Sequence, residues 1–291
     1  DPLWSRGLGD VYKRQTWLAR MMASSPSTRM VYEPSNIRHG LFEGGAPHHQ
    51  PLPLAGPDDD LGVEGQDIVD ALEGRISTTW TNPQRTDRLP RRRVVKDVRT
   101  VGCVPWIAGR LPETPVVLLL RHPIAVAHSI LELGWGLEPE LTGQGSSEVD
   151  PAVAREARSR GLLAEMELWA EHHAFTLRHP AAERVHIVTY EELAQDTTAE
   201  LDRMAAYLAG FEEHWGDWRP DPSRISEPSK TSFRRSEGSA EGWIDSWSSS
   251  YEPEVLEAAV ALLGRWGLDG LYGAGAFPLV SGADVRSAVA R

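Results

Sequence analysis

The chain has 291 residues, of which 41% are hydrophobic and 25% are charged, and its formal net charge is −12. These proportions are typical of a globular protein with one large domain or two small ones, and the negative charge argues against broad nucleic-acid binding, which requires a basic face. No stretch reaches the ~18 apolar residues that cross a bilayer, and the single cysteine, Cys103, indicates a reducing compartment. We therefore expect a cytoplasmic protein that neither binds nucleic acid nor spans a membrane.

Residues 1–15 differ from the rest of the chain. They show no clear hydrophobic period, and the run Gly-Leu-Gly-Asp-Val-Tyr-Lys-Arg-Gln at 7–15 resembles a peptide translated from sequencing-adapter DNA. We therefore expect residues 1–15 to be a non-native segment that stands in place of the native sequence before Thr16, and we exclude them from the fold prediction. From Thr16 to Ser25, apolar residues recur at helical spacing and predict a helix.

Strand and helix signals alternate along the rest of the chain. Strands are predicted at 29–32, 94–97, 116–120 and 185–190, and helices at 67–73, 103–110, 123–132, 155–178, 191–209 and 253–266. This alternation predicts an α/β sandwich with a mainly parallel central sheet in one domain, residues 16–275, followed by a C-terminal tail at 276–291. Two segments without a clear period, 40–66 and 134–152, are expected to be loops that define the substrate site.

The segment 116–129 carries the strongest functional signal. A short apolar run ends at Arg121, and Pro123 suits the first turn of the helix that follows, so Arg121 is expected at the carboxyl end of a strand buried on both faces. Open α/β sheets bind ligands at that edge. Ser129 lies about two helical turns later and can face the same crevice. A guanidinium and a hydroxyl that converge near a helix start predict an anion site, and a phosphate suits it best.

The pattern of Arg121, Pro123 and Ser129 resembles the 3′-phosphate-binding segment of sulfotransferases that use 3′-phosphoadenosine 5′-phosphosulfate (PAPS). The resemblance extends unevenly over nearly the whole chain after residue 15. It implies a three-layer α/β sandwich of the P-loop NTPase-like kind. It also implies in-line transfer of a sulfuryl group from PAPS to a hydroxyl or amine of a small-molecule or glycan acceptor, without a metal.

Further segments bear on how such a protein would hold PAPS. In the family, a loop of the form Pro-x-Ser-Gly-Ser/Thr-Thr-Trp cradles the 5′-phosphosulfate. Here only Thr16-Trp17-Leu18 match it, and Lys13-Arg14-Gln15 stand where Ser-Gly-Thr is expected. The resemblance therefore implies Thr16 and Trp17 as the remaining loop residues. Val-Thr-Tyr-Glu-Glu-Leu at 188–193 resembles the family's strand-end Tyr-Glu-x-Leu and implies that Tyr190 lies near the adenine nucleotide.

The resemblance also implies catalytic residues. Lys96, at the end of the strand predicted at 94–97, matches the family's lysine near the sulfuryl group, where charge must be stabilised during transfer. Glu33, in Tyr-Glu-Pro, matches the place of a carboxylate base. His39 is the alternative base because histidine titrates near neutral pH, and we favour Glu33.

The resemblance also implies that a late basic segment that contains glycine, residues 226–243, closes over the 3′-phosphate, although it departs from the family's better-known Arg-Lys-Gly pattern. Arg234 or Arg235 would then contact that phosphate, and Ser229 is a weaker candidate for contacting the bridging oxygen.

Two alternatives stay open at this stage. An ATP-dependent kinase on a related P-loop-like fold would require a Gly-Lys-Ser/Thr loop and a carboxylate for magnesium. The second alternative is an inactive, truncated remnant of the sulfotransferase fold, because the glycine loop is missing. The pair His48-His49 does not by itself predict a metal site, since further ligands would be needed nearby. Nothing in the sequence indicates an oligomeric state.

Overall fold

The structure is a computed structural model that describes residues 10–25, 27–36, 51–76, 81, 90–132, 151–221 and 244–289. The first half of the chain forms α1 (Asp10–Ala23), β1 (Thr28–Tyr32), the 3₁₀ helix η2 (Pro34–Asn36), α2 (Gly62–Leu72), β2 (Arg92–Lys96), η3 (Val101–Cys103), α3 (Val104–Arg110), β3 (Val117–Leu120) and α4 (Pro123–Glu132). The second half forms α5 (Pro151–Arg178), η5 (Pro180–Arg184), β4 (His186–Thr189), α6 (Tyr190–Gln195), α7 (Thr197–Ala209), α8 (Glu212–Trp215), η7 (Ser248–Ser250), α10 (Pro253–Arg265) and α11 (Val285–Val289).

The described strands form two parallel pairs. In one pair β1 runs beside β2, with Thr28 opposite Arg92 and Tyr32 opposite Lys96. In the other pair β3 runs beside β4, with Leu120 opposite Thr189. The α/β class and the parallel pairing agree with the sequence prediction. Within the described ranges the strands make two sheets of two strands each, not one continuous central sheet.

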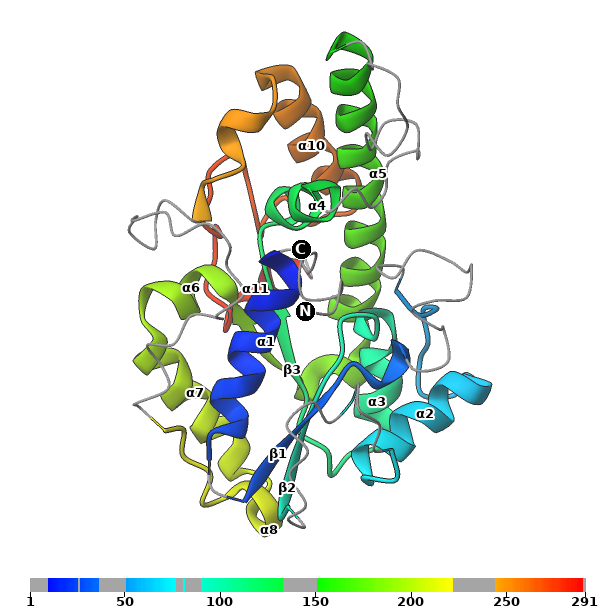
Figure 1. The fold of residues 1–291 in the computed structure, drawn as a ribbon, viewed down its shortest axis with the longest axis vertical. Helices are drawn as coiled ribbons and strands as arrows, with labels where there is room; N and C mark the ends of the chain where they lie inside the picture. Colours follow the sequence, from blue (N-terminus) through cyan, green and yellow to red (C-terminus); the bar gives the residue numbers. More distant parts are fainter. Residues whose placement is uncertain are drawn as a thin grey trace, which may run out of the picture.

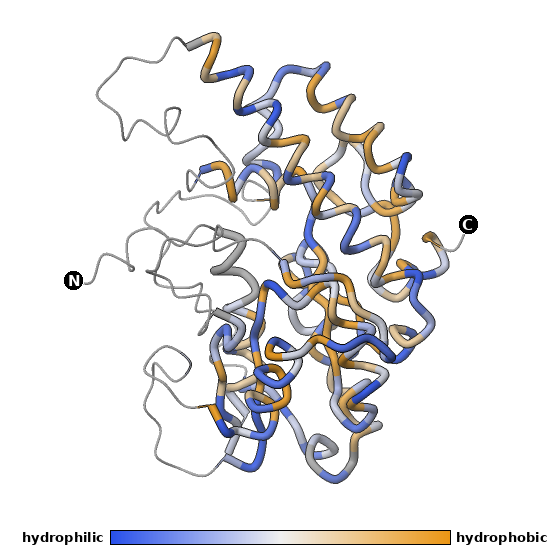
Figure 2. Tube along the Cα trace, turned by 90° about the vertical axis from the view of Figure 1, so that its right-hand side faces the viewer, coloured by the Kyte–Doolittle hydropathy of each residue, from blue (hydrophilic) through white to orange (hydrophobic). Residues whose placement is uncertain are grey.

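Helices surround these strands (Figure 1). α1 packs on β1 and β2, while α4 packs against α5, and α10 and α11 also contact α5. Figure 2 shows hydrophobic and hydrophilic residues succeeding each other within single helices, as expected when one side of each helix is buried. On α5, Leu162, Met166 and Trp169 are buried in the main apolar cluster, and His173 is buried and stacks on Trp169.

Several boundaries differ from the sequence prediction. α1 begins at Asp10, six residues before the predicted start, so part of the segment 1–15 is helical. The predicted loop 40–66 overlaps α2, which begins at Gly62. The single helix predicted at 191–209 is divided at Asp196, because the Asp196 carboxylate caps a new helix by accepting a hydrogen bond from the Ala199 amide at 3.0 Å.

The segment predicted as a C-terminal tail packs on the domain. Val285 and Val289 of α11 are buried in the same apolar cluster as α5. The Gly282 amide donates a hydrogen bond to Glu192 Oε2 at 2.9 Å, which ties this segment to the start of α6. No helix in the described part of the chain has the length and apolar character that crossing a membrane requires.

Candidate functional site

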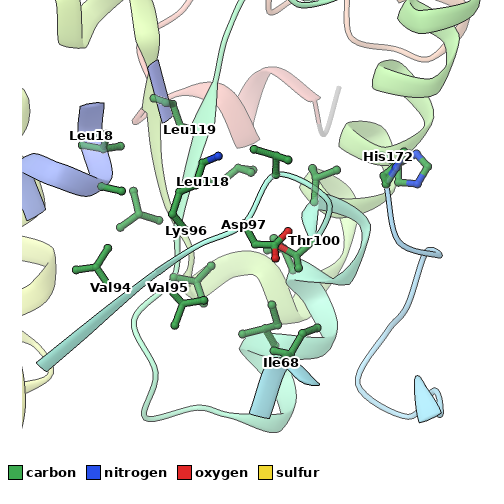
Figure 3. Close-up of a pocket in the computed structure, with 18 of the residues that line it drawn as sticks. Leu18, Ile68, Val94, Val95, Lys96, Asp97, Thr100, Leu118, Leu119 and His172 are labelled. Atoms are coloured by element: carbon green, nitrogen blue, oxygen red, sulfur yellow. The ribbon is translucent and has the colours of Figure 1, made fainter. Parts of the chain in front are cut away.

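A cavity of about 330 Å³ runs along β2 and β3 and reaches the residues at their carboxyl ends, and we call it the central cavity. Its polar lining comes from several elements: Arg93, Lys96, Asp97, Thr100, Thr114, Arg121, Glu165, His172, His173 and Tyr190. Figure 3 shows Lys96 and Asp97 at the end of β2, with Leu118 and Leu119 of β3 beside them. Because Lys96 ends β2 and Arg121 follows β3, the carboxyl ends of both strands meet at this cavity. Parallel α/β sheets bind ligands at that edge.

Arg121 and Ser129 lie in contact, as their spacing predicts. The Arg121 guanidinium donates to Ser129 Oγ at 3.4 Å, and both residues are buried. Arg121 also lies over the ring of Tyr190, with 5.6 Å from its guanidinium carbon to the ring centroid. The register explains this contact, because Leu120 pairs with Thr189 and the next residue of each strand is Arg121 or Tyr190. A buried cation, a hydroxyl and an aromatic face therefore converge at one point.

Glu191 holds the backbone beside Arg121. Its Oε1 accepts a hydrogen bond from the His122 amide at 2.9 Å, and its Oε2 accepts one from the Tyr272 hydroxyl at 3.2 Å. Burial raises the pKa of Glu191, while these hydrogen bonds and the Arg121 charge act in the opposite direction. The turn after β3 is thus held to the turn after β4 by two contacts. Arg121 lies over the ring of Tyr190, and the His122 amide donates to Glu191.

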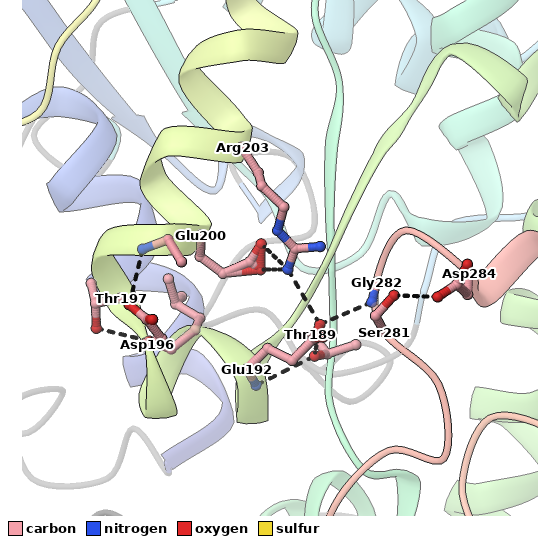
Figure 4. Close-up of polar contacts among 11 residues, drawn as sticks. Thr189, Glu192, Asp196, Thr197, Glu200, Arg203, Ser281, Gly282 and Asp284 are labelled. Carbon is pink, nitrogen blue, oxygen red and sulfur yellow. Dashed lines mark hydrogen bonds and ion pairs between the residues drawn. The ribbon is translucent and has the colours of Figure 1, made fainter.

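The turn that carries Tyr190 is itself fixed by a capping arrangement (Figure 4). Thr189 Oγ1 accepts from the Glu192 amide at 3.4 Å and donates to Glu192 Oε2 at 2.7 Å. Arg203 lies 3.6 Å from the same carboxylate oxygen and also pairs with Glu200. These contacts satisfy backbone groups at the start of α6. These hydrogen bonds and ion pairs hold the backbone at Tyr190 in place.

Glu33 and Lys96 form a buried pair through Lys96 Nζ and Glu33 Oε1. The two residues lie 63 positions apart in the chain, yet the pairing of β1 with β2 places Lys96 opposite Tyr32, the residue before Glu33. Burial raises the pKa of Glu33 and lowers the pKa of Lys96, whereas the charge of each partner opposes the shift. A carboxylate held in this balance can accept a proton more readily than an exposed one.

The backbone at Glu33 is strained. Its φ is +38°, in the left-handed region that residues other than glycine rarely occupy, and Pro34 follows it. Such strain costs on the order of 1–3 kcal/mol and persists only where the surroundings enforce it. Here Asp97 supplies part of that restraint, because its carboxylate accepts hydrogen bonds from the Ser35 hydroxyl and amide at 2.8 and 2.9 Å. The strain marks Glu33 as a functional candidate.

Thr16 joins this pair through Tyr32. The Thr16 and Glu33 side chains both hydrogen-bond the Tyr32 hydroxyl, and burial, followed by the Glu33 charge, raises the pKa of Tyr32. Lys96 Nζ also lies 4.8 Å from the centroid of the Tyr32 ring. Trp17 is half-buried and packs on the cluster around α1, and its Nε1 has no hydrogen-bond acceptor among the described residues.

The structure therefore brings most of the predicted site residues together in two groups. Lys96, Arg121 and Tyr190 line the central cavity directly. Two others contact a lining residue: Glu33 pairs with Lys96, and Ser129 accepts a hydrogen bond from Arg121. Thr16 is one step further away, because it contacts Tyr32, which does not line the cavity but hydrogen-bonds Glu33. Trp17 is not among the residues that line the cavity. His39, Ser229, Arg234 and Arg235 lie outside the described residues, as do His48 and His49.

Sequence reasoning missed Tyr32, Asp97, His122 and Glu191 as parts of the site. Each is the immediate neighbour of a predicted residue, and that adjacency at a strand end is the signal that could have found them. Cys103 is buried, and burial raises its pKa to about 12. Among the residues described, no three His, Cys, Asp or Glu side chains cluster in a way that could hold a metal.

Comparison of the chain with protein-family models, with curated proteins and with solved structures found no match.

The Glu33–Lys96 pair generates a stability prediction. In Lys96→Met the Glu33 carboxyl stays buried without its cation, and removing one partner of a buried pair costs about 3–5 kcal/mol. A carboxyl whose pKa is raised in the folded state releases its proton on unfolding, so the variant should lose more stability at pH 8 than at pH 5. Urea denaturation at both pH values measures this loss.

The double variant Lys96→Met/Glu33→Gln should recover most of the lost free energy, because no charge is left buried. Arg160→Met serves as the matched control, since the ion pair between Arg160 and Glu156 is exposed and should change the free energy of unfolding by less than about 0.5 kcal/mol. A loss in Lys96→Met no larger than in this control would contradict the assignment of a tightly coupled pair.

His122 generates a pH prediction. Burial lowers its pKa to about 4 from 6.5, so the unfolded chain binds one proton that the folded chain does not between these pH values. Stability should be intact above pH 6.5 and fall as the pH drops toward 4, by up to about 1.4 kcal/mol per pH unit for this group. His122→Phe keeps a ring stacked on Trp247 and should show a shallower decline. Denaturation curves with equal pH slopes for both proteins would refute this.

Proposed function

We propose that the protein is a PAPS-dependent sulfotransferase on a P-loop NTPase-like α/β sandwich. The observation that carries the proposal is the contact between Arg121 and Ser129 at the cavity that Lys96 also lines. Two features then coincide at the carboxyl edge of parallel strands: a pair of groups suited to a phosphate, and a lysine paired with a carboxylate. The first suits recognition of a nucleotide phosphate, and the second suits chemistry at an acceptor hydroxyl.

The buried residues fit the phosphate end of such a nucleotide. The Arg121 guanidinium offers several N–H donors in one plane, and Ser129 offers a hydroxyl beside it. The ring of Tyr190 provides an aromatic face next to the guanidinium, suitable for a base or a ribose edge. Glu191 keeps the backbone at His122 in place through a hydrogen bond, so Arg121 keeps its direction when a ligand binds.

PAPS supplies an activated sulfuryl group when it is bound. For transfer, a bond from the acceptor oxygen to sulfur forms while the bond from sulfur to the bridging phosphate oxygen breaks. Glu33 would accept the proton of the acceptor hydroxyl, and its desolvated carboxylate suits that role. Lys96 would stabilise the negative charge that develops on the departing oxygen. His39 remains the alternative base.

A second candidate is a remnant of this enzyme that binds the nucleotide but turns over slowly. The observation in favour is α1, which runs without a break from Asp10 to Ala23. The backbone amides at 14–16 therefore follow the first four N–H groups of the helix, which have no acceptor within it. They donate hydrogen bonds inside α1, whereas a glycine loop would direct them at a phosphate. Restoring a Ser-Gly-Thr loop before Trp17 should then raise turnover, and equal rates for both proteins would exclude this candidate.

Nucleotide preference tests the proposal first. Adenosine 3′,5′-bisphosphate should raise the melting temperature more than ATP, because Arg121 and Ser129 recognise a 3′-phosphate. Arg121→Ala should weaken this binding by about 10- to 100-fold, the range for losing a charge-assisted hydrogen bond. Arg155→Ala is the matched control, since Arg155 is exposed and its ion pair with Glu252, at 3.9 Å, is exposed as well. A larger shift with ATP would favour the kinase alternative.

Turnover tests the base. Glu33→Gln should lower the rate of sulfuryl transfer about 100-fold or more, the usual contribution of a general base. Its affinity for adenosine 3′,5′-bisphosphate should change by less than about threefold, because Glu33 contacts Lys96 and not Arg121. His39→Ala should retain its rate. The reverse result, with His39→Ala inactive and Glu33→Gln active, would transfer the role to His39.

A further inference from the structure

Two arginines lie together at the amino end of β4, whereas the candidate site lies at its carboxyl end. Arg184 is the last residue of η5, and Arg286 lies on α11. Arg286 Nη2 donates to the carbonyl oxygen of Val185 at 2.9 Å, which places its guanidinium beside the residue that follows Arg184. In extended backbone the five steps from Val185 to Tyr190 span about 16 Å. The two arginines, called the arginine pair below, therefore lie well away from the central cavity.

The hydroxyl of Tyr207 on α7 lies close to both guanidinium groups. Burial raises the pKa of Tyr207, and a hydrogen bond to Val116 and the charges of Arg184 and Arg286 lower it. The hydroxyl donates to the Val116 carbonyl at 3.1 Å and accepts from the Val116 amide at 2.9 Å. It is thus fixed at the start of β3, and as a neutral group it compensates neither cation.

Neither guanidinium forms an ion pair within the described part of the chain. Arg184 donates to the Pro112 carbonyl at 2.6 Å and Arg286 to the Val185 carbonyl, and these neutral acceptors hold the two groups without balancing their charge. Arg286 Nη1 is buried and has no hydrogen-bond acceptor among the described residues. Because leaving a buried donor unpaired costs free energy, this nitrogen is suited to an acceptor that comes from outside.

The charge around the arginine pair is positive. Arg203, also on α7, is by contrast directed at Glu192 and Glu200, which balance it (Figure 4). The exposed carboxylate of Glu183 acts on Arg286 from a distance, without an ion pair between them, while burial lowers the pKa of Arg286. Two cations near one carboxylate leave a net positive charge here, although the whole chain has a net charge of −12.

We propose that the arginine pair binds a small tetrahedral oxyanion with two negative charges, such as phosphate. A guanidinium has five N–H donors in a planar fork that matches two oxygens of such an ion. Each arginine uses one nitrogen on its carbonyl acceptor, so further donors stay available. The buried position of Arg286 Nη1 favours a small ion over a bulky anionic group. This inference does not depend on the proposed function.

A bound ion would link segments that are distant in the chain. Arg184 precedes β4, whereas Arg286 belongs to α11, whose Val285 and Val289 are buried in the main apolar cluster. An ion shared by the two arginines relieves the repulsion between their charges and holds α11 against the start of β4. The amides of both segments should therefore open less often when the ion is bound.

The probe is inorganic phosphate, added to the full chain at constant ionic strength with chloride as the comparison ion. Phosphate at about 10 mM should raise the melting temperature by about 2–4 °C, as expected for a ligand that binds only the folded state. Hydrogen exchange should slow in residues 182–187 and 283–289. Because Arg121 can also contact phosphate, the same measurements are made in Arg121→Ala, where both effects should persist.

The double variant Arg184→Met/Arg286→Met should lose most of the temperature shift and of the protection. Its matched control is Arg160→Met/Arg265→Met, which removes the same charge from two exposed arginines that have carboxylate partners, and which should keep both effects. Arg184→Lys/Arg286→Lys keeps the charges without the planar donors and should bind phosphate several-fold more weakly. Circular dichroism checks that each variant folds.

Glycerol 3-phosphate distinguishes the two sources of such an ion. An effect of phosphate alone assigns the site to the free ion, and an equal effect of both assigns it to an esterified phosphate. No stabilisation by phosphate over chloride would overturn the proposal, as when other residues of this chain already occupy the arginine pair. An unchanged response in Arg184→Met/Arg286→Met, or protection confined to the surroundings of Arg121, would overturn it as well. The nucleotide test of the proposed function depends on Arg121 and is read separately.

Discussion

Parallel pairing of short strands is the constraint on which the site depends. When two strands run the same way in register, the residues that follow them are brought to one edge. The pairing of Tyr32 with Lys96 places Glu33 against Lys96, and the pairing of Leu120 with Thr189 places Arg121 over Tyr190. Each contact joins segments far apart in the chain. The candidate chemistry is therefore a consequence of backbone register.

Burial gives these residues their chemical character. Lys96 and Glu33 are almost completely removed from water, which makes their charged forms costly and leaves each dependent on the other. Arg121 is similarly buried beside Ser129. Burying groups of this kind costs stability unless they are paired and hydrogen-bonded, and such groups gather at functional sites. The strained backbone at Glu33 adds a further cost in free energy at the carboxyl end of β1.

The central cavity connects the candidate site with the rest of the fold, because one strand of each pair, β2 and β3, lines it. Its polar end holds Lys96 and Arg121, and its apolar end separates three hydrophobic clusters.

Local pattern by itself determined much of the protein. The apolar run before Arg121, the proline after it and the spacing to Ser129 predicted a strand, a helix at 123–132 and a contact that the structure contains at 3.4 Å. Only the tertiary structure decided that Glu33 pairs with Lys96, that Glu191 fastens the turn at His122, and that the strands divide into two sheets. The physical reason is that periodicity and turn chemistry act over a few residues, whereas register and burial depend on segments that meet only after folding.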